Sequence, residues 1–213
     1  MPRAIARGKE EVMSTVAIVK KSGSVAIAAD TLSSFGARKL SATYATKAGK
    51  IIKIGESYLG LTGWAINQQV LEHAFRSATA APAFASTVEI FEVLLKLHPQ
   101  LKTEYFLTPR GGEEIYEPTH INALIANEHG LFGVYSMRDV VEYERFWASG
   151  SGSDYALGAM HALYDTGADA VTIAEAAVRA AIDFDDGSGA PVESHVIRPV
   201  PAAVDELELL LKT

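Results

Sequence analysis

Residues 10–30 read EEVMSTVAIVKKSGSVAIAAD, and this stretch decides how the chain begins to fold. From Ser14 on, polar and apolar residues alternate over 15–22, and after a glycine an apolar run covers 24–29. Two strand-like segments separated by a glycine turn are typical of a β-hairpin. The second segment ends on an acid, Asp30. The sequence therefore predicts a hairpin that starts beside a hydroxyl residue and ends on a carboxylate.

The rest of the chain is expected to consist of separate blocks of strands and helices. A polar excursion with a short strand is expected at 31–49, followed by a hairpin turning at 55–57 and by helices over 66–75 and 86–98. After a loop at 103–118, strands are expected at 119–127, 131–136 and 140–147. The last elements are helices over 153–167 (capped by Ser153) and 172–182, a strand at 192–198 and an amphipathic tail at 203–212. Segregated blocks indicate an α+β fold. Two antiparallel sheets packed face to face, with a helix pair on each outer side, would bury every apolar face. The predicted architecture is therefore a four-layer αββα sandwich.

Local signals mark several helix ends. Ser86 with Glu89, and Thr172 with Glu175, fit the capping-box pattern of a helix start. Pro99 is expected to end its helix, because the residue before a proline disfavours helical geometry.

The composition limits the classes of function. The chain has 213 residues, 48% hydrophobic and 21% charged, which fits one domain, expected over 14–213. A formal net charge of −7 argues against a nucleic-acid partner, and the lack of cysteine excludes disulfides, thiol catalysis and cysteine-bound zinc. No apolar run approaches the roughly 18 residues of a membrane span. The start of the chain also lacks the apolar region of a secretory signal, so a cytoplasmic protein is expected.

A serine hydroxyl is a weak nucleophile and needs a base. The chain contains no G-x-S-x-G elbow, and its six histidines show neither metal-ligand pairing nor triad spacing. If the chain began at Ser14, the α-amine of that residue, which titrates at about 7.7–8.0, would lie beside its own hydroxyl as a general base. Loss of Met13 would expose it, and residues 1–13 would be a propeptide or an over-called start. Taken alone, Met13 and Ser14 fit an ordinary strand start better.

Five ordered segments resemble the proteasome β-subunits and the bacterial HslV peptidase. STVAIVKKSGSVAIAAD resembles the first hairpin of that family, in which the acid lies sixteen residues after the nucleophile, as Asp30 does after Ser14. KIIKI resembles the strand that carries the family lysine, and LTGWA resembles the turn of the substrate pocket. ASGSGSDYALGAMHALYD resembles the stretch that opens the third helix, and DDGSG resembles the late D-x-x-S-G motif. The resemblance runs from Ser14 to about Ile197 and implies the Ntn (N-terminal nucleophile) hydrolase fold. Within the family, the chain resembles the betaproteobacterial proteasome homologue, a relative of HslV in which some members carry serine as the nucleophile.

The resemblance implies a role for each matching residue. Ser14 would be the nucleophile, and its α-amine would act as the base through a bound water. The residues that would tune or hold this pair are Asp30 and Lys50, then Ser151 and Asp185, with Ser188 beside them. A backbone N–H near Gly63 would bind the oxyanion, and Thr62 would lie near the pocket wall. No cofactor and no metal is implied.

Two of these positions have a competitor. Thr15 is a rival nucleophile, but it would shorten the spacing to Asp30 by one residue and place its side chain on the other face of the sheet. Lys47 competes with Lys50, because the stretch after Asp30 is longer than in HslV. Lys50 is preferred because it leads directly into the apolar strand. Serine also lacks the methyl group that restricts a threonine side chain, so slower peptide cleavage than in threonine relatives is expected.

The resemblance further implies an assembly. The chain would form stacked homo-oligomeric rings of six or seven subunits, which enclose the sites and admit peptides or unfolded proteins. No docking motif for an AAA+ unfoldase is visible, so that partner is left open, and the loop at 103–118 either contacts substrate or forms a surface hairpin. Two other functions remain: a silent ring subunit that keeps residues 1–13, and an Ntn amidohydrolase that acts on a small amide.

Overall fold

The computed structural model describes residues 13–35, 38–76, 82–108 and 115–198. The tail predicted at 203–212, the middle of the loop predicted at 103–118 and residues 1–12 of the N-terminal segment lie outside these ranges. Within the described ranges, no helix combines the length and the apolarity that a membrane crossing requires.

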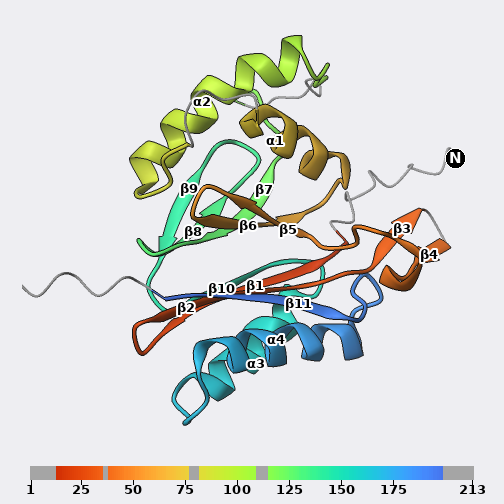
Figure 1. Cartoon of the computed structure of the whole chain (residues 1–213), viewed down its shortest axis with the longest axis vertical. Helices are drawn as coiled ribbons and strands as arrows, with labels where there is room; N and C mark the ends of the chain where they lie inside the picture. The colour runs from red at the N-terminus through yellow and green to blue at the C-terminus, as the bar shows by residue number, and fades with distance from the viewer. Residues whose placement is uncertain (1–12, 36–37, 77–81, 109–114, 199–213) are drawn as a thin grey trace, which may run out of the picture.

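Two antiparallel sheets lie at the centre of the molecule (Figure 1). In spatial order, the first sheet contains β10 (Phe146–Gly150), β1 (Thr15–Lys21), β2 (Ser24–Asp30) and β11 (Val192–Ile197). The second sheet contains β5 (Ile51–Ile54), β6 (Ser57–Thr62), β7 (Asn122–Ala126), β8 (Leu131–Val134) and β9 (Val140–Tyr143). The excursion after β2 holds the pair β3 (Ser33–Phe35) and β4 (Arg38–Leu40), followed by the 3-10 turn η1 (Ala42–Tyr44).

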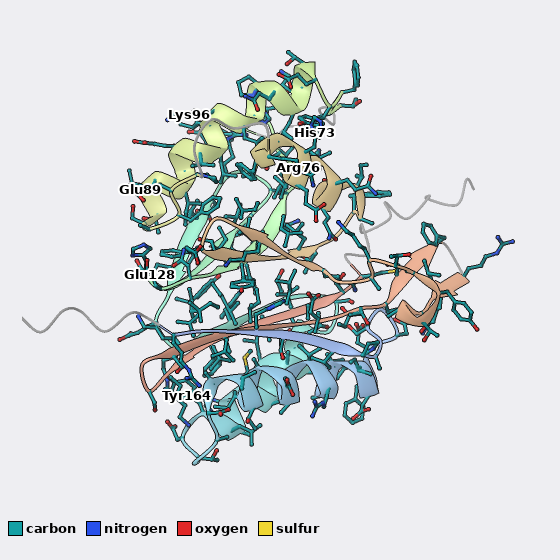
Figure 2. The ribbon with its side chains drawn as sticks, viewed as in Figure 1. His73, Arg76, Glu89, Lys96, Glu128 and Tyr164 are labelled. Atoms are coloured by element: carbon teal, nitrogen blue, oxygen red, sulfur yellow. The ribbon has the colours of Figure 1, made fainter. Side chains whose placement is uncertain are left out.

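Helices cover both outer faces of the sandwich. The helices α1 (Ile66–Arg76) and α2 (Thr87–Thr103) lie over the second sheet, whereas α3 (Ser153–Tyr164) and α4 (Ala170–Phe184) lie over the first (Figure 1). Exposed charged side chains such as those of Arg76 and Lys96 lie on the helices of the outer layer (Figure 2). The α+β class and the four-layer αββα sandwich predicted from the sequence are confirmed.

Strand β1 is buried on both of its faces, which explains its nearly continuous apolar run. Val16 and Ile18 face the second sheet, and Ala17 and Val19 pack against α3 and α4. The two sheets approach closely at Gly60, where a Cβ atom would lie 2.4 Å from the Val16 side chain. This close packing holds the start of β1, and therefore Ser14, in a fixed place between the layers.

Helix α2 corrects the prediction that its chain segment leaves the helix before Pro99. Pro99 lies inside α2, which continues to Thr103. A proline removes one backbone hydrogen bond from a helix interior, but the apolar side chains on either side of it, Leu97 and Leu101, are both buried against the second sheet. Burial of that face outweighs the local preference of the proline.

The segment predicted as one strand over 140–147 forms two strands in different sheets. Strand β9 ends at Tyr143 at the edge of the second sheet, and β10 begins at Phe146 beside β1 in the first. The backbone crosses between the sheets at Glu144 and Arg145, and the carbonyl of Arg145 accepts a hydrogen bond from Lys20. An apolar pattern shows that a residue is buried but not in which sheet, so this crossing leaves no mark in the sequence.

The helix caps on the first-sheet side also differ from prediction. Helix α4 begins at Ala170, and the carboxylate of Asp169 caps it by accepting a hydrogen bond from the backbone N–H of Thr172 at 2.8 Å. Bonds from Thr172 hold the pKa of Asp169 below its ordinary value. Ser153 is the first residue of α3 rather than its cap, and Gly152 occupies the capping position without a side chain. Aspartate is as good a cap as serine or threonine, so the capping-box pattern placed the cap at Thr172, three residues too late.

Candidate active site

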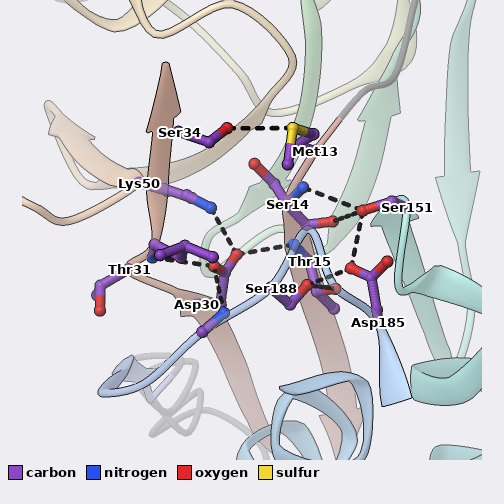
Figure 3. Close-up of polar contacts among 12 residues, drawn as sticks. Met13, Ser14, Thr15, Asp30, Thr31, Ser34, Lys50, Ser151, Asp185 and Ser188 are labelled. Atoms are coloured by element: carbon purple, nitrogen blue, oxygen red, sulfur yellow. Dashed lines mark hydrogen bonds and ion pairs between the residues drawn. The ribbon is translucent and has the colours of Figure 1, made fainter. Parts of the chain in front are cut away.

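Ser14 lies immediately before β1 and is almost completely buried, with 3% of its surface exposed. Its backbone φ of 152° falls in a region that L-residues rarely adopt. Its side chain and that of Lys50 extend into the same space beside Asp30 (Figure 3). Met13 is still attached, and its sulfur accepts a hydrogen bond from the Ser34 hydroxyl at 3.1 Å. In this form the nitrogen of Ser14 is an amide.

Asp30 is fully buried at the end of β2, and both of its carboxylate oxygens are saturated with donors. Oδ1 accepts from the Thr15 backbone N–H at 2.8 Å and from the Lys50 ammonium at 2.7 Å. Oδ2 accepts from the backbone N–H groups of Leu32 and Gly189, each at 3.0 Å. Asp30 therefore ties together the start of β1, the start of β5 and the turn before β11.

Lys50 is the lysine that pairs with Asp30. Burial lowers the pKa of Lys50, and the attraction of Asp30 and of the more distant Asp185 opposes this shift without cancelling it. Lys47, the competing candidate, is exposed and lines a surface cavity with Phe75 and Arg76 instead. Of the two candidates, it is therefore Lys50 that lies beside Asp30.

On the other side of Ser14, a second set of hydroxyls surrounds Asp185, the residue that follows α4 (Figure 3). The Ser14 nitrogen donates to the Ser151 hydroxyl at 3.3 Å, and that hydroxyl donates to Asp185 Oδ2 at 2.8 Å. Ser188 donates to the same oxygen at 2.7 Å. The hydroxyl of Thr15 lies 2.7 Å from that of Ser188. All six residues expected at the catalytic centre are thus part of one hydrogen-bonded cluster or lie directly beside it.

Two glycines leave the room that this cluster occupies. Gly150 ends β10 with a φ of +105°, and a Cβ atom there would lie 2.0 Å from the Ser14 carbonyl oxygen. A Cβ atom on Gly152 would lie 2.2 Å from the Thr15 hydroxyl. A larger residue at 150 would displace the backbone of Ser14, and one at 152 would displace the side chains of Thr15 and Ala181. The segment 150–152 is therefore a tightly packed turn that has no room for a larger residue at either glycine.

Thr62 and Gly63, the residues expected at the pocket and oxyanion site, end β6 on the same side of the sandwich. The Thr62 hydroxyl is buried and lies 3.2 Å from the Ser149 hydroxyl on β10, so it links the two sheets. Gly63 has a φ of +95°, and a Cβ atom there would meet no heavy atom within 4 Å. The Gly63 backbone thus borders open space.

The sequence missed several groups that complete the site. The backbone N–H groups of Leu32 and Gly189 bind Asp30, and backbone donors carry no signal in residue type. Thr15 was weighed only as a rival nucleophile, whereas its hydroxyl lies on the helix side and contacts Ser188. Ser149, the partner of Thr62, lies inside the Gly-Ser stretch that the resemblance had already marked. Among the described residues, no cluster of three or more histidines or acids could hold a metal ion.

A four-layer αββα sandwich with a buried hydroxyl residue at the start of a central strand, flanked by an Asp–Lys pair, defines an Ntn hydrolase of the proteasome type. Residues 12–197 match the family model described as proteasome subunit. The chain belongs to this family, which is a family of Ntn peptidases. No curated protein matches it.

Solved structures of the family are similar over most of the chain. Thiobacillus denitrificans BPH is 44% identical over 88% of this chain and 100% of that chain, with a TM-score of 0.84. The same protein in complex with epoxomicin gives 44% identity, the same coverage and a TM-score of 0.83. Eukaryotic HslV from Trypanosoma brucei is 22% identical over 86% of this chain and 99% of that chain, with a TM-score of 0.62, which is a likeness of fold.

Proposed function

We propose that this chain is a peptidase subunit in which Ser14 is the nucleophile and its own α-amine is the general base. The observation that carries the proposal is the position of the Ser14 nitrogen. It contacts Ser151, which is held by Asp185, and Ser14 lies between Ser151 and the Lys50–Asp30 pair (Figure 3). A nitrogen in this place becomes a base as soon as it is no longer an amide.

The mature enzyme begins at Ser14 in this proposal. An amide nitrogen has no basic lone pair, so the bond between Met13 and Ser14 must be broken before the site can work. The unusual φ of 152° at Ser14 supports this step, because such a conformation costs on the order of 1–3 kcal/mol in a chain that continues on both sides. Breaking the bond removes the torsional constraint and frees the amine.

The reaction is acyl transfer. The Ser14 hydroxyl attacks the peptide carbonyl while its proton passes to the α-amine, and a bound water can relay it. The oxyanion that forms is stabilised by a backbone N–H near Gly63, with Thr62 at the pocket wall. The intermediate collapses to an ester on Ser14 as the ammonium protonates the departing amine. Water, activated by the same α-amine, then hydrolyses the ester.

The two charged groups beside Ser14 have different tasks. The positive charge of Lys50 disfavours protonation of the α-amine and so keeps more of it in the basic form. Asp30, which receives four hydrogen bonds, fixes the ammonium of Lys50 at 2.7 Å. Ser151 and Asp185 orient the amine from the other side, with Ser188 holding the carboxylate.

The substrates are peptides or unfolded proteins, and the working form is an assembly. Members of the proteasome family form stacked rings, which supports self-association of this chain into a double ring of six- or seven-membered rings in the cytoplasm. A solved structure of the 44%-identical BPH is a complex with epoxomicin, which supports a ligand-binding site in this chain as well. No feature of the described residues identifies an unfoldase partner.

Three variants at one position test the proposed nucleophile. Protein whose first residue is Ser14 by intact mass should cleave long fluorogenic peptides and run as a large ring on native mass measurement. Ser14→Ala should assemble equally well but lose activity by at least about a hundredfold, since the nucleophile is gone. Ser14→Thr keeps both the hydroxyl and the amine and should remain active. Retained activity in Ser14→Ala, or a monomeric wild type that cleaves only small amides, would contradict the proposal.

A further inference from the structure

Thr15 occupies an unusual position for a hydroxyl. It is the first residue of β1 and is completely buried, on the face of the strand where Ala17 and Val19 pack against α3 and α4. The next residues of β1 on this face are apolar, and valine has the same shape as threonine, so packing alone does not require a hydroxyl here. A buried hydroxyl is unfavourable unless it is hydrogen-bonded, and the Thr15 hydroxyl meets this requirement through its contact with Ser188.

The direction of the hydrogen bonds follows from counting protons. The Asp185 carboxylate only accepts, and Ser151 and Ser188 each donate their single hydroxyl proton to its Oδ2 atom. Ser188 therefore has no proton left for Thr15, and Thr15 must donate to Ser188 across the 2.7 Å contact. Two chains of donors converge on Asp185: one runs from the Ser14 nitrogen through Ser151, and the other runs from the Thr15 hydroxyl through Ser188.

The backbone of Thr15 contacts the other half of the site. Its N–H donates to Asp30 Oδ1 at 2.8 Å, the same oxygen that holds the Lys50 ammonium. Thr15 is thus joined to Asp30 directly through its backbone N–H, and to Asp185 through its hydroxyl and Ser188. Because Ser14 is covalently attached to it, the position of this residue fixes the amine relative to both carboxylates.

Helix α3 is built to leave space for this hydroxyl. A Cβ atom on Gly152 would lie 2.2 Å from Thr15 Oγ1 and 3.2 Å from Asp185 Oδ2. Position 152 therefore requires a glycine as long as the Thr15 hydroxyl and the Asp185 carboxylate keep these positions. This requirement is independent of the hydrogen bonds and points to the same pair of groups.

We propose that Thr15 is a positioning residue of the peptidase site: its hydroxyl, acting through Ser188, holds Asp185 and thereby Ser151 in the place where the Ser14 amine can exchange its proton. The inference rests on the proposed function of Ser14. An accepted hydrogen bond makes a hydroxyl a better donor, so loss of the Thr15 proton weakens the bond from Ser188 to Asp185 and loosens the carboxylate.

Two substitutions separate the hydroxyl from the packing. Thr15→Val keeps the shape and removes the donor, whereas Thr15→Ser keeps the donor and removes a methyl group. In protein whose first residue is Ser14, Thr15→Val should lower kcat by about tenfold with KM within about twofold, because a positioning group acts on the proton transfer. Thr15→Ser should stay within about threefold of wild type in kcat while melting at a lower temperature than Thr15→Val, because it leaves a cavity.

A second readout does not depend on peptidase activity. The pH dependence of acetylation of the Ser14 α-amine, followed by mass spectrometry, reports how that amine titrates. In wild type and Thr15→Ser the fixed Asp185 carboxylate favours the protonated amine, so in Thr15→Val the midpoint should move to lower pH. Ser188→Ala should give the same shift, and the double variant with Thr15→Val should shift no further.

The outcomes distinguish this inference from the proposed function. If Thr15→Val keeps the wild-type amine titration, or if Thr15→Ser is as impaired as Thr15→Val, the hydroxyl has no positioning role and the inference fails. If the amine titration shifts as expected but peptide cleavage survives in Ser14→Ala, the positioning by Thr15 stands and the assignment of the nucleophile falls.

Discussion

At the scale of single residues, Asp30 has the strongest set of constraints in the site. It is completely buried, and it accepts hydrogen bonds from Thr15, Leu32, Gly189 and the ammonium of Lys50. An ionised carboxylate is stable in such a place only with compensating donors. The ion pair with Lys50 therefore stabilises the buried carboxylate at the end of β2. In the proposed function it also sets the pKa of the Ser14 amine.

The two lysines that competed in the sequence can be separated by experiment. We expect Lys50→Ala to reduce peptidase activity by at least about a hundredfold, because the charge that keeps the α-amine basic is lost and Asp30 is left without its cation. Lys47→Ala serves as the matched control, since Lys47 is exposed and lines a surface cavity with Phe75 and Arg76, and it should retain wild-type kcat/KM. Native mass should be unchanged in both. The reverse pattern of activities would show that the wrong lysine has been assigned.

The side chains that meet at the site belong to ordered motifs, so their proximity could be predicted from the sequence. The spacing from Ser14 to Asp30, the lysine before an apolar strand and the serines near Asp185 all led to residues that the structure brings together. The backbone donors of Leu32 and Gly189 could not be foreseen, because every residue type except proline carries the same N–H group. The bond from Thr15 to Ser188 depends on the packing of α4 against β1.

At the scale of elements, the turn from β10 into α3 determines where Ser151 lies. Gly150 adopts a positive φ, Ser151 projects toward Ser14 and Asp185, and Gly152 caps the helix without a side chain. A wider turn would move the Ser151 hydroxyl away from both partners. The close approach of Gly152 to Thr15 shows how little room this turn has.

Two glycines of the same region give a controlled test of that fit. Gly152→Ala should lower kcat by about a hundredfold, because the added methyl group must displace the Thr15 hydroxyl or the turn by a large fraction of an ångström. Gly158→Ala lies in the middle of α3, where a Cβ atom meets nothing within 4 Å. It should leave activity unchanged and stabilise the protein by about 0.5–1 kcal/mol in urea unfolding. Equal activity of the two variants would mean that the turn is not tightly constrained.

The elements themselves were predicted well where periodicity is strong and poorly where tertiary packing decides. The hairpin of β1 and β2 followed from the strand pattern and helix α1 from apolar spacing, whereas α3 and α4 were predicted from capping signals that placed their caps one and three residues too late. Pro99 was read as a helix end, but the burial of Leu97 and Leu101 carries α2 past it. The strand expected over 140–147 divides between two sheets, a choice that depends on partners far along the chain.

At the scale of the whole molecule, the site forms where distant parts of the chain meet at one end of the sandwich. Groups from the start of β1, the ends of β2 and β10, the residue before β5 and the segment after α4 meet there (Figures 1 and 3). The order of blocks in the sequence was sufficient to predict the four layers. The meeting of these ends follows only once both sheets and the α3–α4 layer have packed.

Covalent labelling with a peptide α′,β′-epoxyketone tests the central claim most directly, because the reagent needs a hydroxyl and a free amine on one residue. The hydroxyl adds to the ketone and the amine opens the epoxide, so the mass rises by that of the whole inhibitor. We predict one label per mature chain, located on Ser14 by fragmentation, and none in Ser14→Ala or in chains that still carry Met13. A label that persists in Ser14→Ala, or that lies on another residue, would contradict the account.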